Sequence, residues 1–421
     1  MIFFFLLISI MPLTQHPFWT RYAGQMTMIK YVGGACCLYA IVYLLSRPAT
    51  PKYFQTWQSR WFVILLSLVC ISEWTSDASV SIAENPLTSY VCFFLLFFIT
   101  LTIVDSLSRL RCVLLAIIGS IAWASIYVVR EYQKYHAMYS GFRPGWVVGD
   151  ANYFSISALV SLPLAFYLSV ESSRKWERIV CLACLCVTLL AVTLAASRGG
   201  FLGLAAAFLF VAVRSPHWLR NLSLAVLLLV PLSLISPSSP LDRLLKPTSS
   251  DREAAEARTV SWMAGLRMVR MSPLTGVGPG NFKPLMLRFA DPKPGQTIEP
   301  HIAHNAYIEI AAESGVPALV AFLALLWCSF WILEQVNRAT HRAGPVLLRQ
   351  AALGIQGGLV GNLVALFFVS GEYQKLFWLM VFLSIVVHTC AEHYGHRGVI
   401  SERREDKRFE TRQRTAPQLN G

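Results

Sequence analysis

Long uninterrupted apolar runs constrain this chain more than any other feature. Runs of about 17 to 23 residues recur along it, each long enough to cross a hydrocarbon core of roughly 30 Å as a helix. Hydrophobic residues make up 55% of the 421 residues and charged residues only 14%, whereas a soluble protein carries roughly a quarter charged residues. The pattern therefore predicts an all-α polytopic membrane protein and excludes a soluble enzyme.

Polar breaks divide the apolar runs into about twelve expected transmembrane helices. They lie near 1–13, 29–46, 58–74, 88–105, 111–129, 153–170, 178–197, 199–214, 219–236, 316–336, 350–370 and 375–391. The first run lacks a positive n-region and a small-residue cleavage site, so it is interpreted as a span rather than a signal peptide. The expected membrane domain is 1–391, and the charged segment 392–421 is predicted to be a disordered cytoplasmic tail.

Basic residues indicate how the chain is oriented. Lys and Arg concentrate in alternate loops and in the tail, and the positive-inside rule places those loops and both termini in the cytoplasm. A loop of roughly 70 residues, about 236–303, then falls outside, and long loops translocate largely regardless of charge. Because the net charge of +13 is explained by topology, no nucleic-acid partner is expected.

Two polar breaks on the predicted outer side carry candidate site residues. Ser197–Gly200 separates two apolar runs with almost no loop and holds Arg198 at the membrane edge. A charge there is costly unless it has a partner, so Arg198 is a candidate functional residue, and the alternative is a turn whose arginine contacts lipid phosphates. Asp150 and Asn152 open the sixth span, where they either bind sugar hydroxyls or, as we favour, cap the helix.

The large loop contains an expected helix from about 251 to 271, which ends where Ser272-Pro273 disfavours further helix. At 100° per residue, Arg258 and Trp262 share one stripe and Arg267 lies on the opposite side. The Arg258 and Trp262 stripe offers an anion-binding guanidinium beside an aromatic platform. The alternative is a surface helix with incidental arginines.

The segment that follows this helix leads to a candidate general base. Residues 273–282 are glycine-rich but lack the Gly-Lys-Ser/Thr of a phosphate loop, so they predict a rigid turn rather than a nucleotide site. His304 then opens the tenth span, and a neutral imidazole there is a plausible base. On a helical wheel Glu309 and Glu313 lie roughly 140° and 180° from it, which predicts that they do not orient it. His301 lies nearby, but without a third ligand no metal is expected.

These motifs together resemble those of the O-antigen ligase and polymerase superfamily of bacterial membrane glycosyltransferases. The pair His304-Asn305, followed after nine residues by Gly315, is similar to the histidine motif of that superfamily. The likeness extends, in order and spacing from about 140 to 335, to Ser197-Arg198-Gly199-Gly200, to Arg258 with Trp262, and to residues 273–282.

The resemblance implies transfer of a glycan from undecaprenyl diphosphate to a hydroxyl acceptor, such as lipid A-core, on the periplasmic face of the bacterial inner membrane. It implies neither a metal nor a cofactor. By this pattern His304 is the base, and Arg198 and Arg258 bind the diphosphate. The further candidate substrate-binding residues are Trp262, Asn305, Asp150 and Asn152.

Other functions stay open at this point. A polysaccharide polymerase or a protein O-oligosaccharyltransferase would use the same donor, and we favour a ligase because the ligase-type histidine motif is the strongest part of the resemblance. A transporter of lipid-linked glycan should have polar residues along a path through the bilayer, whereas the charges here gather at one face. A metal-dependent transferase using outer acids such as Glu73, Asp77 and Glu84 lacks a compact metal motif.

Overall fold

The computed structural model describes most of the chain. The described residues are 1–13, 28–46, 53–76, 86–139, 142–145, 148, 150–214, 249–291, 299–341 and 344–394. Within these ranges every regular element is a helix. Each expected span in these ranges coincides with a helix, and the expected span near 219–236 lies outside them, as does most of the expected tail.

The helices follow one another along the chain without an intervening strand in the described ranges. They are α1 (Ile2–Ile10) with the short 3-10 helix η1 (Met11–Leu13), α3 (Met28–Leu45), α4 (Trp57–Thr75), α5 (Leu87–Ile103), α6 (Leu107–Tyr135), α7 (Ala151–Glu171), α8 (Lys175–Ala195), α9 (Arg198–Val213), α12 (Ser249–Met271), α13 (Phe282–Phe289), α14 (Ala306–Thr340), α15 (Val346–Ala365) and the C-terminal helix Lys375–Tyr394.

Six of these helices are long and apolar enough to cross a membrane. They are α3, α6, α7, α8, α14 and the C-terminal helix, while α5 and α9 are apolar but shorter. The protein is therefore an all-α polytopic membrane protein, as the apolar runs predict.

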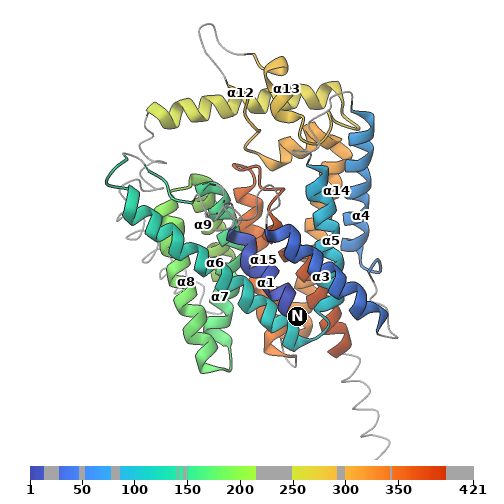
Figure 1. Ribbon diagram of the computed structural model, residues 1–421, viewed down its shortest axis with the longest axis vertical. Helices are drawn as coiled ribbons and strands as arrows, with labels where there is room; N and C mark the ends of the chain where they lie inside the picture. The colour runs from blue at the N-terminus through green and yellow to red at the C-terminus, as the bar shows by residue number, and fades with distance from the viewer. Residues whose placement is uncertain are drawn as a thin grey trace, which may run out of the picture.

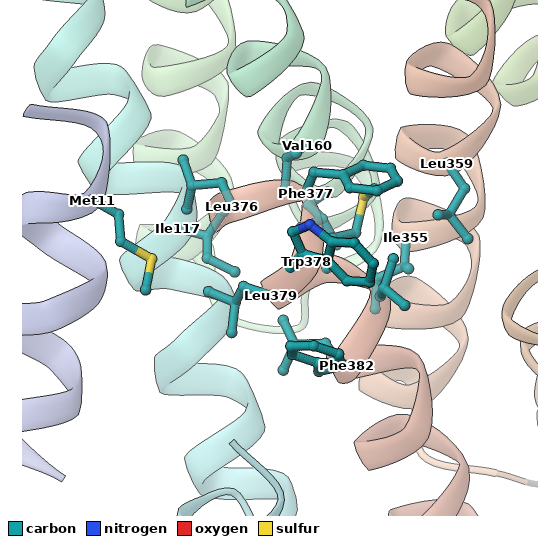
Figure 2. Close-up of a cluster of buried hydrophobic side chains, with 14 of the residues drawn as sticks. Met11, Ile117, Val160, Ile355, Leu359, Leu376, Phe377, Trp378, Leu379 and Phe382 are labelled. Carbon is teal, nitrogen blue, oxygen red and sulfur yellow. The ribbon is translucent and has the colours of Figure 1, made fainter. Parts of the chain in front are cut away.

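The C-terminal helix runs through the centre of the bundle. Trp378 on this helix is 1% exposed, and its ring lies 5.2 Å from the ring of Phe93 in α5. Figure 2 shows the neighbouring side chains of the same helix meeting Ile117 of α6 and Ile355 of α15. Apolar residues therefore pack inside the protein as well as on its surface, and the C-terminal helix contacts α5, α6 and α15.

Helix α12 lies across one end of this bundle, as Figure 1 shows. Together with the following turn and α13 it forms a cover segment, residues 249–291. Its inner side has a small apolar core of its own, in which Ala264, Met268 and Phe282 are fully buried. Gly265 permits the close approach of α12 to α14, because a Cβ there would lie 2.5 Å from Ile308 Cγ2.

The glycine-rich turn fastens the cover segment to a break in α14. Gly315 has φ 84° and ψ 165°, so α14 is interrupted there. The backbone N–H groups of Val277 and Gly278 donate to the carbonyls of Ala312 and Glu313, each at 2.9 Å. The turn therefore satisfies carbonyls near the break, and its role is the structural one that the sequence predicts.

Candidate active site

The predicted histidine lies immediately before α14. His304 has φ +50°, in the left-handed region that residues other than glycine rarely adopt. Asn305 is the N-cap of α14, and its side-chain oxygen accepts from the N–H groups of Tyr307 at 3.0 Å and Ile308 at 3.1 Å. The chain therefore turns sharply at His304 and becomes helical only at Ala306.

Hydrogen bonds on both sides of Ala303 hold this turn. The Ala303 carbonyl accepts from Trp262 Nε1 at 2.9 Å. The Ala303 N–H donates to Glu309 Oε2 at 3.2 Å, and the Ser370 hydroxyl donates to the same oxygen. A strained backbone persists only where its surroundings over-determine it, and these contacts provide that restraint for His304.

The surroundings of the imidazole favour its neutral form. Burial lowers the pKa of His304 to about 4, and the positive charge of Arg258 contributes to the decrease. The negative charge of Asp150 opposes this effect, and His301 adds to it. His304 is therefore neutral at pH 7 and has a lone pair that can accept a proton.

Opposite faces of α12 separate its two candidate arginines. Arg258 interacts electrostatically with His304. Arg267 instead donates to the carbonyl of Phe289 at 2.7 Å and lies 3.3 Å from Asp291 Oδ2. The helical wheel predicts this separation, and it leaves Arg258 as the α12 arginine beside the histidine.

The second predicted arginine begins α9. Ser197 is the N-cap of that helix, and its hydroxyl accepts from the N–H of Gly200 at 3.2 Å. Ala196, just before it, is left-handed with φ +49°. Arg198 Nη2 lies 3.8 Å from Oδ1 of Asp251, a residue that is 2% exposed in the first turn of α12. Arg198 therefore links the bundle to the cover segment.

The start of α7 supports this α8–α9 turn. Asn152 Oδ1 accepts from Arg143 Nη2 at 3.0 Å and from Ser197 Oγ at 2.8 Å. Asp150 caps α7, because its Oδ1 accepts from the N–H groups of Asn152 at 2.6 Å and Tyr153 at 2.9 Å. Asp150 thus has the capping role that we favour, whereas Asn152 does not cap α7 and instead joins this helix to the N-cap of α9.

Two of the expected substrate-binding residues bond to the backbone. The Trp262 indole N–H is used by Ala303, and its ring packs edge-on against Phe367 at 5.6 Å between centroids. Asn305 is 1% exposed and caps α14. These side chains therefore hold the histidine turn in this structure. The sequence predicts instead that the Trp262 ring binds a sugar of the substrate.

Several residues at the site escape reasoning from the sequence alone. Asp251 pairs with Arg198 on a different helix, and Arg143 bonds both to nearby Asn152 and to the distant carbonyl of Ala195. A helical wheel, which assumes that His304 is helical, places Glu309 away from the ring, but Glu309 bonds to the backbone of Ala303. Ser370 comes from the segment after α15. Only Glu309 carried a signal, since its side chain is one turn into the helix that follows the histidine.

The structure thus brings His304, Arg258 and Asp150 together, and it places Arg198 at the same end of the bundle. Among the residues that the structure describes, no group of three or more His, Cys, Asp or Glu side chains forms a candidate metal site. What the arrangement offers chemically is a neutral base beside fixed positive charge.

Fold and site together define a polytopic helical membrane protein with a basic, histidine-containing site at one end of its bundle. Residues 182–323 match the family model described as O-antigen ligase. This segment runs from α8 into α14 and contains Arg198, Arg258 and His304, so the match covers the motifs that resemble the O-antigen ligase superfamily. No curated protein matches the chain.

Proposed function

We propose that the protein transfers a glycan from undecaprenyl diphosphate to a hydroxyl acceptor, as an O-antigen ligase does. The observation that carries this proposal is the neutral His304 beside Arg258, within the segment that matches the O-antigen ligase family. The family match supports a glycosyltransferase-like enzyme of the ligase or polymerase type. We further propose that the site faces the periplasm and that the membrane is the bacterial inner membrane.

In the proposed reaction, His304 accepts the proton of the acceptor hydroxyl as its oxygen attacks the anomeric carbon. The bond between that carbon and the diphosphate oxygen breaks, and the electron pair leaves with the lipid diphosphate. The leaving group gains negative charge, which Arg258 and Arg198 stabilise. After the reaction the proton is on the imidazole, the glycan is on the acceptor and the lipid diphosphate is free.

Binding of the donor would also make His304 a stronger base. Arg258 lowers the pKa of the free imidazole, and a bound diphosphate would neutralise that charge and add negative charge nearby. A nearby negative charge favours the protonated imidazole and so raises its pKa. The base would therefore gain strength only when the donor is in place. The two arginines supply the positive charge, so we propose a reaction without metal.

Loss of the gene tests the function and separates the ligase from its rivals. We expect surface glycan to disappear while long chains persist on the polyprenyl carrier. Single repeat units on the carrier would instead indicate a polymerase, and glycan lost from proteins would indicate a protein O-oligosaccharyltransferase. If purified protein moved lipid-linked glycan across vesicles without transferring it to any acceptor, the enzyme proposal would be wrong.

A further inference from the structure

We propose that Glu309 is a positioning residue that holds His304 in its left-handed conformation by binding the Ala303 peptide. This inference rests on the proposed role of His304 as the base. Glu309 does not touch the ring in any described contact. It acts through the backbone, and for that reason the positions on a helical wheel do not reveal it.

The geometry converges on one residue. Glu309 Oε2 accepts the Ala303 N–H at 3.2 Å, and Trp262 Nε1 donates to the Ala303 carbonyl at 2.9 Å. These bonds fix the peptide planes on both sides of the Ala303 Cα. The second of these planes leads directly into His304, so its orientation determines where the imidazole can point.

Burial excludes water from these hydrogen bonds. Ala303 is fully buried and Glu309 is 3% exposed, so water cannot replace the carboxylate as the acceptor of the Ala303 N–H. A buried N–H without a partner costs about 1 to 3 kcal/mol. The Ser370 hydroxyl, which is 2% exposed, donates to the same carboxylate oxygen and keeps Glu309 in this rotamer.

The acceptor function of Glu309 does not require its negative charge. Glu313 and Glu372 lie close enough to interact with it electrostatically, and both are buried. Adjacent carboxylates repel one another when ionised, but a carboxyl or an amide oxygen also accepts the Ala303 N–H. A glutamine at position 309 therefore keeps the proposed contact, whereas an alanine removes it.

The experiment compares Glu309→Ala, Glu309→Gln and Trp262→Phe in the full-length protein in detergent. Glu256→Ala is the matched control, because Glu256 is exposed on α12 of the same end of the molecule. Transfer is measured with an undecaprenyl-diphosphate-linked glycan, giving kcat, KM for the donor and the pH profile of kcat/KM. Reaction of His304 with diethyl pyrocarbonate, followed by mass spectrometry, reports the histidine turn independently of activity.

For Glu309→Ala we expect kcat to fall about 10- to 100-fold, because small displacements of a catalytic group cost up to about 10²-fold. KM for the donor should stay within about twofold, since the arginines are untouched. Release of the imidazole into water should move the acid limb of kcat/KM from near 4 towards the ordinary histidine value of about 6.5. Modification of His304 should become faster.

Glu309→Gln keeps an acceptor for the Ala303 N–H, whereas Trp262→Phe removes the donor to the Ala303 carbonyl. Glu309→Gln should keep most of the activity and a slow modification rate, and Trp262→Phe should shift both quantities in the same direction as Glu309→Ala. The double variant Glu309→Ala with His304→Ala should be no slower than His304→Ala alone, because Glu309 acts only through the histidine.

Failure of the inference is distinguishable from failure of the proposed function. If His304→Ala abolishes transfer but Glu309→Ala matches Glu256→Ala in kcat and in modification rate, Glu309 does not position the histidine. Equal losses for Glu309→Gln and Glu309→Ala would also overturn the inference. Full activity of His304→Ala would instead reject His304 as the base, and absence of transfer by the unsubstituted protein would reject the proposed function. Should Glu309→Ala not be recovered folded, Glu309→Gln and Trp262→Phe still decide the question.

Discussion

At the scale of single residues, the site is unusual for the strain that it holds. Ala196 and His304 are the described non-glycine residues with positive φ; Ala196 directly precedes the Ser197–Gly200 motif, and His304 opens the histidine motif. Left-handed conformations cost of the order of 1 to 3 kcal/mol and cluster at functional sites. The two strained residues therefore mark the same two turns that the motifs single out.

Replacement of the proposed base is the most direct test at this scale. We expect His304→Ala to lower turnover by about 10²- to 10⁴-fold, the usual contribution of a positioned acid or base. Membrane expression should be unchanged, because the alanine relieves rather than creates burial of a polar ring. Transfer of glycan at the wild-type rate by the purified variant would make His304 a structural residue.

The pH dependence follows from the same side chain. A base acts when it is deprotonated, so a pKa lowered to about 4 keeps kcat/KM constant from neutral pH down to about pH 5 and lets it fall below that. This profile reports the free enzyme. The measurement is kcat/KM across the acid range, and a midpoint at or above about 6.5 would contradict the buried, Arg258-adjacent position of the ring.

The two arginines should not be replaceable by lysine. Arg198→Lys and Arg258→Lys keep the charge but lose the planar fork that binds a diphosphate through two hydrogen bonds. We therefore expect higher KM for the donor with only partial activity, and Arg267→Lys, on the other side of α12, serves as the control. Wild-type kinetics for both substitutions would exclude bidentate binding of the diphosphate.

At the scale of elements, the break in α14 explains the glycine-rich turn. A Cβ at Gly315 would lie 2.2 Å from the carbonyl oxygen of Leu274, and Val316 donates its N–H to the carbonyl of Pro273 at 2.8 Å. Helix, break and turn therefore form one unit. At its other end α14 begins only at Ala306, so a helical wheel extended back to the left-handed His304 does not describe the position of that residue.

Gly315→Ala tests that unit. We expect a loss of about 1 to 3 kcal/mol in stability from the strained φ alone, seen as a lower thermal midpoint in detergent and a lower rate of transfer. Gly119→Ala in α6 is the matched control, since a Cβ there has nothing within 4 Å, and replacing a helical glycine with alanine is neutral or stabilising. Equal midpoints for the two variants would mean that the turn does not depend on Gly315.

How far the sequence predicts this structure depends on the range of the contacts. The apolar spans, the helix of the large loop and the Asp150 cap follow from local periodicity and side-chain chemistry. The contacts of Arg198 with Asp251, and of Asn152 with Ser197, join residues on different helices. No period or spacing in one sequence reveals such pairs, and the same is true of Trp262 and Ala303.

At the scale of the whole molecule, the orientation in the membrane is the prediction with the widest consequences. Ser249→Cys, at the start of α12, should react with an impermeant thiol reagent from the periplasm in a cysteine-free background. Ser173→Cys, in the basic loop between α7 and α8, should react only after the membrane is opened. The basic loops motivate this expectation, and the reverse labelling pattern would place the site in the cytoplasm.

Helix α12 is attached to the bundle near both of its ends, and this restricts how it can move. Its first turn is joined to α9 through Asp251 and Arg198, and beyond its last turn the glycine-rich segment is bonded to α14. Because both ends of α12 are attached, neither end can move away from the bundle without breaking these contacts. On the proposed function, α12 would therefore stay in place while the glycan is transferred.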